Sequence, residues 1–348
     1  MEVHTLFITS EVSIREAIKQ LDLTAKKLLV VVEHKKLIGV ITDGDIRRWI
    51  LKNGDITKPV QYVMNTSPVY LREEDRCRAL DTMRQHSVEG IPLLNETHEV
   101  VDVVFLSEHC ERERFDNKLP KVPVVIMAGG KGTRLYPYTN VIPKPLIPIG
   151  DIPIVERIMN QFKTYGFEEF YLTINYKKDF IKAYFSGEFL YHLTLLEEET
   201  PQGTAASLKL IKERINGSFF VSNCDILLDI NYEKLLRFHQ ENKNRITLVT
   251  ALKCYEIPYG VVNLGEHGNV MLLKEKPNLE FLVNTGLYVL ESEILQYIPE
   301  EKTYDMTNLI QDCLDKNEKV GAYPVSDSTW LDMGEWKELA HMEERLSL

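Results

Sequence analysis

The sequence has few cysteines, no long apolar run and no excess of positive charge. It contains 348 residues with five cysteines, and none of these cysteines forms a Cys-x-x-Cys pair. No histidine lies three to five residues from another. A structural zinc site or a disulfide framework is therefore not expected. No apolar run approaches the ~20 residues that a membrane-spanning helix needs, so we expect no membrane partner.

The net charge and the first residues exclude further classes of protein. The net charge is −11, which argues against a broad nucleic-acid-binding surface. The first residues, MEVHTLFITSEV, lack the basic and apolar regions of a signal peptide. These features predict a cytoplasmic protein. The length is sufficient for two or three domains with sizeable cores.

The most informative segment is AGGKGTRLYPYT, which runs from Ala128 to Thr139 and follows an apolar, strand-like stretch at 122–127. Glycines at 129, 130 and 132 would let backbone N–H groups converge on an anion without Cβ clashes. Cations at Lys131, Arg134 and Lys144 suit phosphate. The segment therefore predicts a strand, a glycine loop and a site for a nucleoside triphosphate.

Two better-known glycine loops do not fit this segment. A Walker A loop places Lys and then Ser or Thr after its second glycine, whereas Thr133 and Arg134 follow Gly132. A dinucleotide fingerprint needs a third glycine where Leu135 stands. Together with KPLIPI at 144–149, the segment resembles the GGxGTRL, P-x-T and KP-L-P hallmark of the sugar-1-phosphate nucleotidyltransferase family.

The first part of the chain contains a weak internal repeat. Residues 13–21 and 75–83 are both typical of short amphipathic helices, and 28–45 aligns with 91–108 as strand, turn, strand and polar loop. Such a doubled unit, with GVITDGDIRR at 39–48, resembles a pair of cystathionine-β-synthase (CBS) domains. The resemblance implies that Thr42 and Asp45 contact an adenine or guanine nucleotide, although Asp45 could equally cap the next helix. The second repeat has Phe105 and Glu108 at the matching positions, so at most one nucleotide site is expected.

The remainder of the chain alternates apolar strands with helical stretches, which predicts an α/β fold. We expect a mostly parallel, Rossmann-like sheet of the nucleotide-diphospho-sugar transferase type, with a smaller N-terminal α/β CBS pair. A charged, proline-ended stretch at 111–121 is typical of a linker. The predicted divisions are 1–58 and 59–119 for the CBS repeats and 120–348 for the transferase domain. Predicted helices cover 154–164, 178–186, 205–214, 232–241 and 306–317. Residues 219–228 are predicted as a strand segment, with Asp225 at the end of its first part, FFVSNCD.

Further motifs follow in the order that the transferase family has. By that resemblance Asp225 and Asp332 would bind the catalytic Mg²⁺, because hard cations prefer carboxylate oxygen. Glu335 replaces a common threonine beside Asp332. The resemblance implies these further sets: Arg134, Lys144, Lys276 and Asp225 for catalysis; Ala128, Gly129, Gly130, Gly132, Thr133, Gln202, Gly203 and Thr204 for the nucleotide; Tyr259, Gly260, Glu275, Lys276, Asn284 and Gly286 for the sugar phosphate.

The resemblance implies an enzyme that joins an NTP to a sugar-1-phosphate and releases pyrophosphate. Fusion to a CBS pair is similar to guanylyltransferases that make GDP-glucosamine for legionaminic acid, which favours GTP and glucosamine-1-phosphate. Mannose- or heptose-1-phosphate with GTP, and a hexose-1-phosphate with dTTP, CTP or UTP, stay open. A non-catalytic adenylate sensor is the alternative from another class. We also expect a homo-oligomer formed through the CBS pair.

Overall fold

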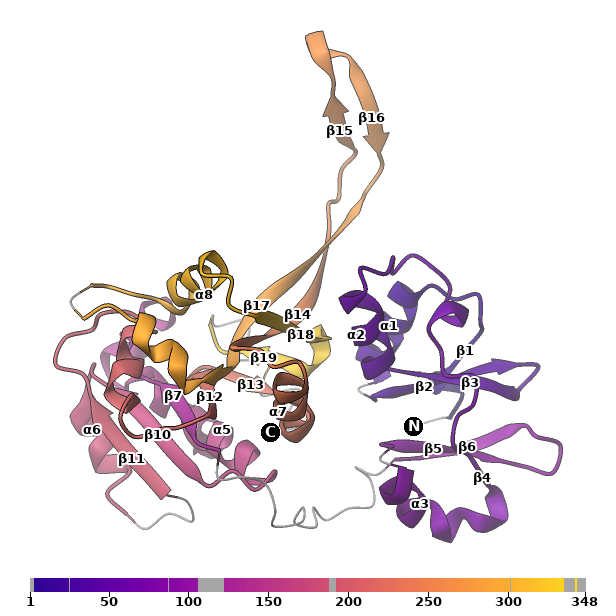
Figure 1. The fold of residues 1–348 in the computed structure, drawn as a ribbon. Helices are drawn as coiled ribbons and strands as arrows, with labels where there is room; N and C mark the ends of the chain where they lie inside the picture. The colour runs from indigo at the N-terminus through magenta and orange to yellow at the C-terminus, as the bar shows by residue number, and fades with distance from the viewer. Residues whose placement is uncertain are drawn as a thin grey trace. The chain divides into compact units, whose positions relative to one another are not determined.

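The computed structural model describes residues 3–24, 26–86, 88–105, 122–187, 192–300, 302–334 and 342. The chain divides into two units, Met1–Glu113 and Arg114–Leu348 (Figure 1). This division falls in the predicted linker at 111–121, which lies outside the described residues. No helix in the described part is both long and apolar enough to cross a bilayer.

The first unit contains two similar small sheets. One consists of β1 (Phe7–Ile8), β2 (Leu28–Glu33) and β3 (Lys36–Thr42), with α1 (Ile14–Thr24) and α2 (Asp43–Leu51). The other consists of β4 (Leu71–Arg72), β5 (Gly90–Leu94) and β6 (Val100–Phe105), with α3 (Ala79–His86). In both sheets the first strand is parallel to the second and the second is antiparallel to the third. The strand order therefore repeats, as the sequence predicts.

The sequence of α1 explains why this segment is helical. Its buried residues are Ile14, Ala17 and Leu21, which lie on one helix face at spacings of three and four. Ser13 and Glu16 exchange hydrogen bonds, with the Ser13 backbone N–H donating to Glu16 Oε2 at 3.0 Å. This reciprocal pattern is a capping box, and it starts the helix where the apolar periodicity begins.

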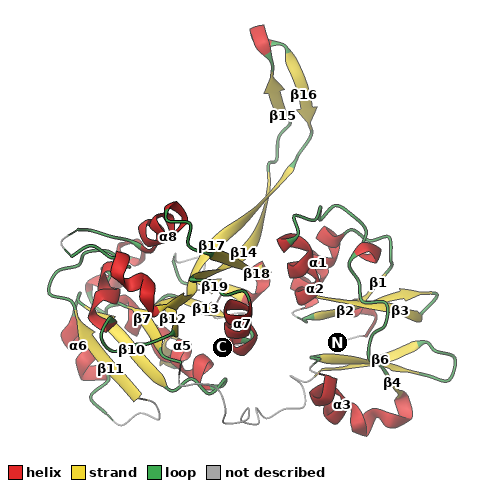
Figure 2. Cartoon of the chain, in the orientation of Figure 1, coloured by secondary structure: helices red, strands yellow, loops and turns green. Residues whose placement is uncertain are grey.

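The second unit is built on a seven-stranded sheet (Figures 1 and 2). Its spatial order is β11 (His192–Glu197), β10 (Glu169–Ile174), β7 (Val124–Met127), β12 (Ser218–Asn223), β17 (Asn278–Glu291), β14 (Ile246–Glu256) and β18 (Val320–Ser326). Strand β17 is antiparallel to both neighbours, and the other adjacent pairs are parallel. The predicted mostly parallel α/β sheet is therefore confirmed.

Both faces of this sheet are covered. Along β7, Val124 and Ile126 belong to one buried cluster, whereas Val125 and Met127 belong to another. Helices α5 (Ile154–Lys163) and α7 (Tyr232–Glu241) contribute to the first cluster, and α8 (Met306–Asp315) contributes to the second. Helix α6 (Lys178–Tyr184) adds Ile181 to the first cluster. A strand buried on both faces explains the continuous apolar run before the glycine loop.

The sheet order creates a crevice beside β7. The chain passes from β7 to β10 and β11 on one side, and then to β12 on the other side. The connections after β7 and after β12 therefore diverge at the same sheet edge, which is where open α/β sheets bind ligands. The glycine loop follows β7, and Asp225 follows β12.

Smaller elements complete the fold. The short strands are β8 (Pro148–Ile149), β9 (Ile152–Pro153), β13 (Ile226–Leu228), β15 (Val261–Leu264), β16 (Val270–Lys274) and β19 (Trp330–Asp332). The 3₁₀ helices are η1 (Val3–Leu6), η2 (Val60–Tyr62), η3 (Glu73–Arg78), η4 (Thr133–Leu135), η5 (Tyr138–Asn140), η6 (Lys144–Leu146), η7 (Ala206–Ile211), η8 (Glu266–Gly268), η9 (Ser292–Tyr297) and η10 (Asp327–Thr329).

Two local predictions were wrong. The segment predicted as an α-helix over 205–214 is the 3₁₀ helix η7, which lacks a side-chain cap at its start. Residues 219–228 do not form one continuous strand, because the chain breaks at Cys224 and Asp225 between β12 and β13, so that the first strand ends just before Asp225. Strand β13 instead pairs with β19 in a separate two-stranded sheet. The break leaves Asp225 in a loop at the sheet edge.

A long two-stranded ribbon leaves the second unit (Figures 1 and 2). We call residues 255–282 the arm. It contains the ends of β14 and β17 and the β15–β16 hairpin. Most of its apolar side chains are exposed, with Tyr259 and Met271 each 74% accessible.

Candidate active site

The glycine loop has a conformation that its residue types explain. Gly132 has a φ of +62°, in the left-handed region that disfavours other residues. A Cβ at Gly132 would lie 3.0 Å from the Cβ of Lys144, so the side chain of a larger residue would also collide with Lys144. Leu135, which ends η4, is fully buried and anchors the loop in the core.

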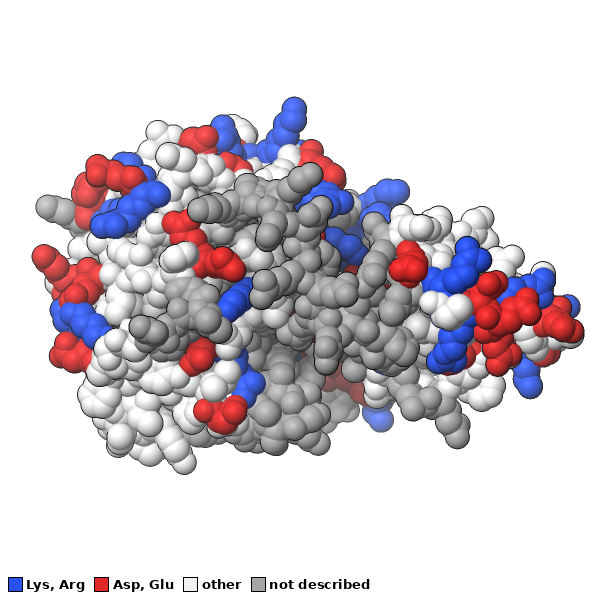
Figure 3. Space-filling model, turned by 90° about the horizontal axis from the view of Figure 1, so that it is seen from below, with Lys and Arg blue, Asp and Glu red and all other residues white. Residues whose placement is uncertain are grey.

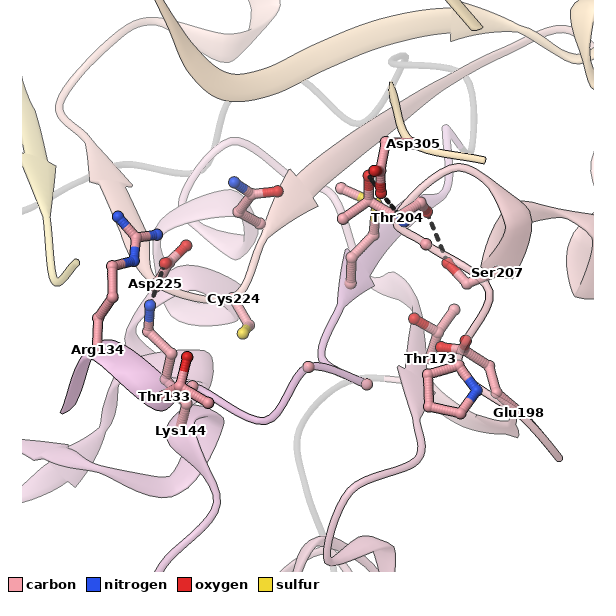
Figure 4. Close-up of a pocket in the computed structure, with 17 residues that line it drawn as sticks. Thr133, Arg134, Lys144, Thr173, Glu198, Thr204, Ser207, Cys224, Asp225 and Asp305 are labelled. Carbon is pink, nitrogen blue, oxygen red and sulfur yellow. Dashed lines mark hydrogen bonds and ion pairs between the residues drawn. The ribbon is translucent and has the colours of Figure 1, made fainter. Parts of the chain in front are cut away.

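The loop forms one wall of a pocket of about 360 Å³ (Figure 4). The lining residues come from the ends of several parallel strands and from the loops beyond them. They are Met127, Gly129, Gly130, Gly132, Thr133, Arg134, Lys144, Thr173, Glu198, Pro201, Gly203, Thr204, Ser207, Asn223, Cys224, Asp225 and Asp305. Most of the predicted nucleotide residues and three of the predicted catalytic residues therefore meet in one place. Ala128 is buried behind the loop, and its N–H donates to the Thr173 carbonyl oxygen at 3.0 Å.

An ion pair lies at one side of this pocket. The Lys144 ammonium donates to the Asp225 carboxylate, and the two side chains are only 9% and 13% exposed. Burying two charges costs desolvation free energy that their attraction only partly recovers. The pair is therefore not expected to add much to the free energy of unfolding. Cys224 lies in the chain between the end of β12 and Asp225. Burial raises the pKa of its thiol to about 12. This thiol is therefore protonated near neutral pH and unsuited to act as a nucleophile.

Asp332 lies next to this ion pair. Strand β19 pairs with β13 so that Asp332 is opposite Ile226, and the Met333 N–H donates to the Asp225 carbonyl oxygen at 2.8 Å. Burial raises the pKa of Asp332, and the Asp225 charge raises it further, while Lys144 and Arg134 act in the opposite direction. A Cβ at Gly334 would contact both Asp332 and Arg134, at 3.2 and 3.4 Å.

These two carboxylates suit a divalent cation. Repulsion between Asp225 and Asp332 is part of what raises the Asp332 pKa, and a bound cation would remove that penalty. Within the described ranges no group of three or more His, Cys, Asp or Glu side chains could hold a metal. The protein would thus supply two carboxylates, and Mg²⁺ commonly binds one or two carboxylates together with waters and substrate phosphates.

The opposite side of the pocket is polar and is held by α8. Gly203 has a φ of +101°, and a Cβ there would lie 2.7 Å from the Tyr304 carbonyl oxygen. The Thr204 N–H donates to Asp305 Oδ1 at 3.0 Å, and the Met306 N–H donates to Thr204 Oγ1 at 3.0 Å. Thr204 therefore ties the pocket loop to the start of α8.

Gln202, predicted to contact the base, does not line the pocket. Its side-chain oxygen accepts a hydrogen bond from Lys209 Nζ at 3.3 Å, and its carbonyl oxygen accepts from the Tyr304 N–H at 2.6 Å. Gln202 thus contributes to the loop's position.

The residues predicted for the sugar phosphate fall in two places, and none lines the pocket. Tyr259, Gly260, Glu275 and Lys276 lie on the arm and are exposed, with Gly260 and Glu275 close together. Asn284 and Gly286 lie on β17 near the pocket. Gly286 has a φ of +90°, and a Cβ there would lie 2.4 Å from Nδ2 of the lining residue Asn223.

In the first unit, Thr42 and Asp45 form a complete helix cap. The Asp45 N–H donates to Thr42 Oγ1 at 3.2 Å, and the Thr42 N–H donates to Asp45 Oδ2 at 2.9 Å. Arg48 also pairs with Asp45. The capping alternative for Asp45 is therefore realised. Phe105 is buried, whereas Glu108 lies outside the described residues.

Several lining residues were missed by the sequence reasoning. Glu198 sits in a run of three glutamates, and Asp305 in a polar loop, so neither had a distinguishing signal. Their position one residue past β11 and one before α8 could have marked them, because such positions meet at the same sheet edge.

Comparison with known proteins supports the assignment of the second unit. The nucleotidyl transferase family model matches residues 123–347, which is more than half of the chain. The chain belongs to the nucleotidyl transferase family. The CBS domain model matches residues 1–52. The assignment of the second repeat as a CBS unit is therefore supported by its strand order and not by this family match.

Individual relatives share the second unit. A D-glycero-alpha-D-manno-heptose 1-phosphate guanylyltransferase from Campylobacter jejuni is 30% identical over 60% of this chain and 93% of its own length. A UTP–glucose-1-phosphate uridylyltransferase from Synechocystis is 29% identical over 60% of this chain and 59% of its own length. The crystal structure of HddC from Yersinia pseudotuberculosis has a TM-score of 0.52 at 24% identity, over 65% of this chain and 99% of HddC, which shows the shared fold. The nucleotide named differs among these relatives.

Proposed function

We propose that this chain is a sugar-1-phosphate guanylyltransferase. An oxygen of the sugar-1-phosphate attacks the α-phosphorus of GTP, the bond from that phosphorus to the bridging oxygen of the β-phosphate breaks, and pyrophosphate leaves. The observation that carries the proposal is the meeting of the glycine loop with Arg134, Lys144 and Asp225 in one pocket. Backbone N–H groups and two cations stabilise the triphosphate charge, and no protein nucleophile is required.

The ion pair and the loop have distinct tasks in this reaction. The buried Lys144 is held in place by Asp225 and directs its charge at the phosphates. Gly129 and Gly130 leave room for the phosphates to approach the backbone. Arg134 adds a second cation at the leaving pyrophosphate. When Mg²⁺ is bound by Asp225 and Asp332, it supplies positive charge at the α-phosphate.

For the acceptor we propose glucosamine-1-phosphate, with mannose- and heptose-1-phosphate as alternatives. The heptose-1-phosphate guanylyltransferase relative and a mannose-1-phosphate guanyltransferase of Saccharomyces cerevisiae, 28% identical, favour a guanylyl donor with a hexose or heptose phosphate. The uridylyltransferase relative keeps UTP as an alternative donor. A place in legionaminic acid formation is proposed only from the fusion to a CBS pair.

For the first unit we propose assembly into a homo-oligomer and at most one purine-nucleotide site. Asp45 already accepts hydrogen bonds from Thr42 and pairs with Arg48, which favours the structural role. Calorimetry with AMP, ATP, GMP and GTP on the full chain and on a Thr42→Ala, Asp45→Ala variant would count the sites. Because GTP also binds the proposed transferase pocket, only sites lost in the variant belong to the first unit, and loss of two such sites per chain would contradict the proposal.

The test of the reaction is a panel of five NTPs against glucose-, glucosamine-, mannose- and heptose-1-phosphate, with pyrophosphate release as the readout. We expect GTP to give the highest kcat/KM. Every pair is run with Mg²⁺ and with a chelator, and we expect no turnover with the chelator. Absence of pyrophosphate release with all pairs would favour the non-catalytic nucleotide sensor.

A further inference from the structure

The arm, which leaves the second unit as a ribbon in Figure 1, exposes an unusual amount of apolar surface. Within the described part of residues 255–282, eleven large apolar side chains are between 42% and 74% accessible. They are Tyr255, Tyr259, Val262, Leu264, Val270, Met271, Leu272, Leu273, Leu279, Phe281 and Leu282. Together they expose roughly 1,000 Å², whereas the largest apolar patch on a typical monomer is about 300–600 Å². An excess of this kind marks an interaction surface.

The hairpin at the end of the arm has little support of its own. Among the strands that the structure describes, β15 and β16 pair only with each other. An isolated two-stranded hairpin is marginally stable in water and gains stability when another strand or surface covers its apolar face. A long apolar strand with an unpaired edge also promotes aggregation unless it is covered. The arm is therefore better suited to contact with a partner than to contact with solvent.

The strand register gathers apolar side chains on one face of this hairpin. Val262 is opposite Leu273. Leu264 is opposite Val270. Side chains directly opposite in antiparallel strands share a face, and so do positions two apart along one strand. These four side chains, which are 47% to 67% accessible, form what we call the arm face.

The composition of the hairpin indicates which kind of partner it contacts. From Tyr259 to Leu273, Glu266 in η8 is the one Asp, Glu, Lys or Arg. Interfaces between transient partners are about as polar as the rest of a protein surface, whereas permanent homodimer interfaces are more apolar and depleted in charge. Burial of apolar surface has no preferred direction, so an apolar face can pack on a copy of itself about a twofold axis.

The size of the exposed surface is also sufficient for such a dimer. A standard interface buries about 800 Å² on each partner, and the arm exposes roughly 1,000 Å² of apolar side chain. Most of the arm must therefore take part, including the ends of β14 and β17 that carry Tyr255 and Phe281.

We propose that the arm is a dimerisation element, and that the arm face packs against the arm of a second copy of this chain. This interface is separate from the assembly proposed for the first unit, and it does not depend on the proposed reaction. A chain that uses both interfaces would form a higher oligomer, and a chain that uses the arm alone would form a dimer.

The first test is Leu264→Glu in the full chain, with Asn263→Glu as the matched control. Asn263 is the neighbouring position and pairs with Leu272, so its side chain lies on the opposite face of the ribbon. Both positions are exposed, and neither substitution should prevent folding. A carboxylate buried in the arm face should raise the dissociation constant on the order of 100-fold or more.

Sedimentation velocity over a dilution series measures this effect. At concentrations where the wild type is associated, Leu264→Glu should halve the mass, and Asn263→Glu should leave it unchanged. A mass that Leu264→Glu does not change overturns the proposal, whether the wild type is a monomer or an oligomer. Equal dissociation in both variants overturns the assignment of the arm face.

The second test identifies what covers the arm. The full chain with photoreactive benzoylphenylalanine in place of Leu264 is prepared with and without a heavy isotope label, and the two forms are mixed and irradiated. We expect mass spectrometry to find links between labelled and unlabelled copies that end within residues 255–282. Links that all lie within one copy, or that end in the first unit, overturn the proposal. Pyrophosphate release is measured on the wild type separately, so an inactive protein with linked arms would contradict the proposed reaction alone.

Discussion

Lys144 and Asp225 form a buried ion pair although 81 positions separate them in the sequence. Lys144 starts η6 after the glycine loop, and Asp225 lies in the break between β12 and β13. The pair therefore joins the two segments that diverge on either side of β7. It fixes the cationic side of the pocket before any substrate arrives.

Asp225→Asn should reduce turnover by on the order of 10²-fold or more, because an amide is a poor ligand for Mg²⁺. Asparagine still offers Lys144 an oxygen acceptor, so the fold should persist. Asp225→Ala would leave a buried cation alone and cost about 3–5 kcal/mol. Pyrophosphate release and thermal unfolding measure the two effects. Asp151→Asn, at a side chain that is 87% exposed, is the control. Wild-type turnover in Asp225→Asn would refute the site assignment.

Arg134→Ala and Lys276→Ala should affect different substrates. Arg134 lines the pocket, so its loss should weaken NTP use, whereas Lys276 on the arm should affect use of the sugar-1-phosphate. Each change removes one charge-assisted contact, roughly 1.5–3 kcal/mol. Steady-state kinetics with each substrate varied in turn would measure this. Lys274→Ala, also on the arm and exposed, controls for general loss of charge. The assignment fails if each variant perturbs only the other substrate.

Gly203→Ala should be more damaging than Gly166→Ala. Both glycines have a positive φ, +101° and +82°, so alanine is strained at either position. That strain alone costs about 1–2 kcal/mol. At Gly166 nothing lies within 4 Å of an added Cβ, but at Gly203 the Tyr304 carbonyl oxygen would be at 2.7 Å. We expect a larger loss of unfolding free energy and weaker NTP binding for Gly203→Ala only. Equal effects in urea unfolding would show that the Tyr304 contact relaxes freely.

Glu198→Gln should change how stability depends on pH. Burial raises the Glu198 pKa from 4.5 to about 7, so the folded state keeps this proton to a higher pH than the unfolded state. Ionisation therefore lowers wild-type stability as the pH rises through this window, and glutamine removes that loss. The gain of the variant over the wild type should be small at pH 4.5 and reach a plateau near pH 8. Urea unfolding at several pH values measures it. A gain that is constant with pH would contradict the prediction.

Thr42→Ala should destabilise the first unit by about 1 kcal/mol, because the N-cap hydroxyl of α2 is lost. Thr42→Ser keeps that hydroxyl and should restore most of the stability. Thermal unfolding of the full chain would follow the first unit, and the activity of the second unit should stay unchanged. Equal stability of all three proteins would show that Thr42 is not a structural cap.

Much of the fold was predictable because its signals are local. Helix α7 was predicted with the observed bounds, since the Asn231 side chain caps it and its buried residues follow the helical period. Helix α8 starts at the predicted residue, after Asp305. The glycine loop was predictable because closely spaced glycines followed by cations are typical of a loop that binds phosphate.

The remainder depends on contacts that no local pattern encodes. The break at Cys224 and Asp225 exists because β13 pairs with β19, about a hundred positions later. Glu198 was missed because its role comes from the approach of Gly129, not from its neighbours in the run of glutamates. The arm was missed as well, because the short apolar runs of β15 and β16 are typical of buried strands, whereas here they are largely exposed.

The pairing of β19 with β13 also bears on how the protein is made. On the ribosome, the first unit is complete within its first 113 residues, well before the transferase sheet exists. The pocket segment around Asp225 gains its partner strand only when Asp332 has been synthesised. In a nascent chain the first unit is thus synthesised while the second unit still lacks β19, the strand that pairs with β13 beside Asp225. Because such distant contacts close slowly, assembly of the active site should be the late event in folding.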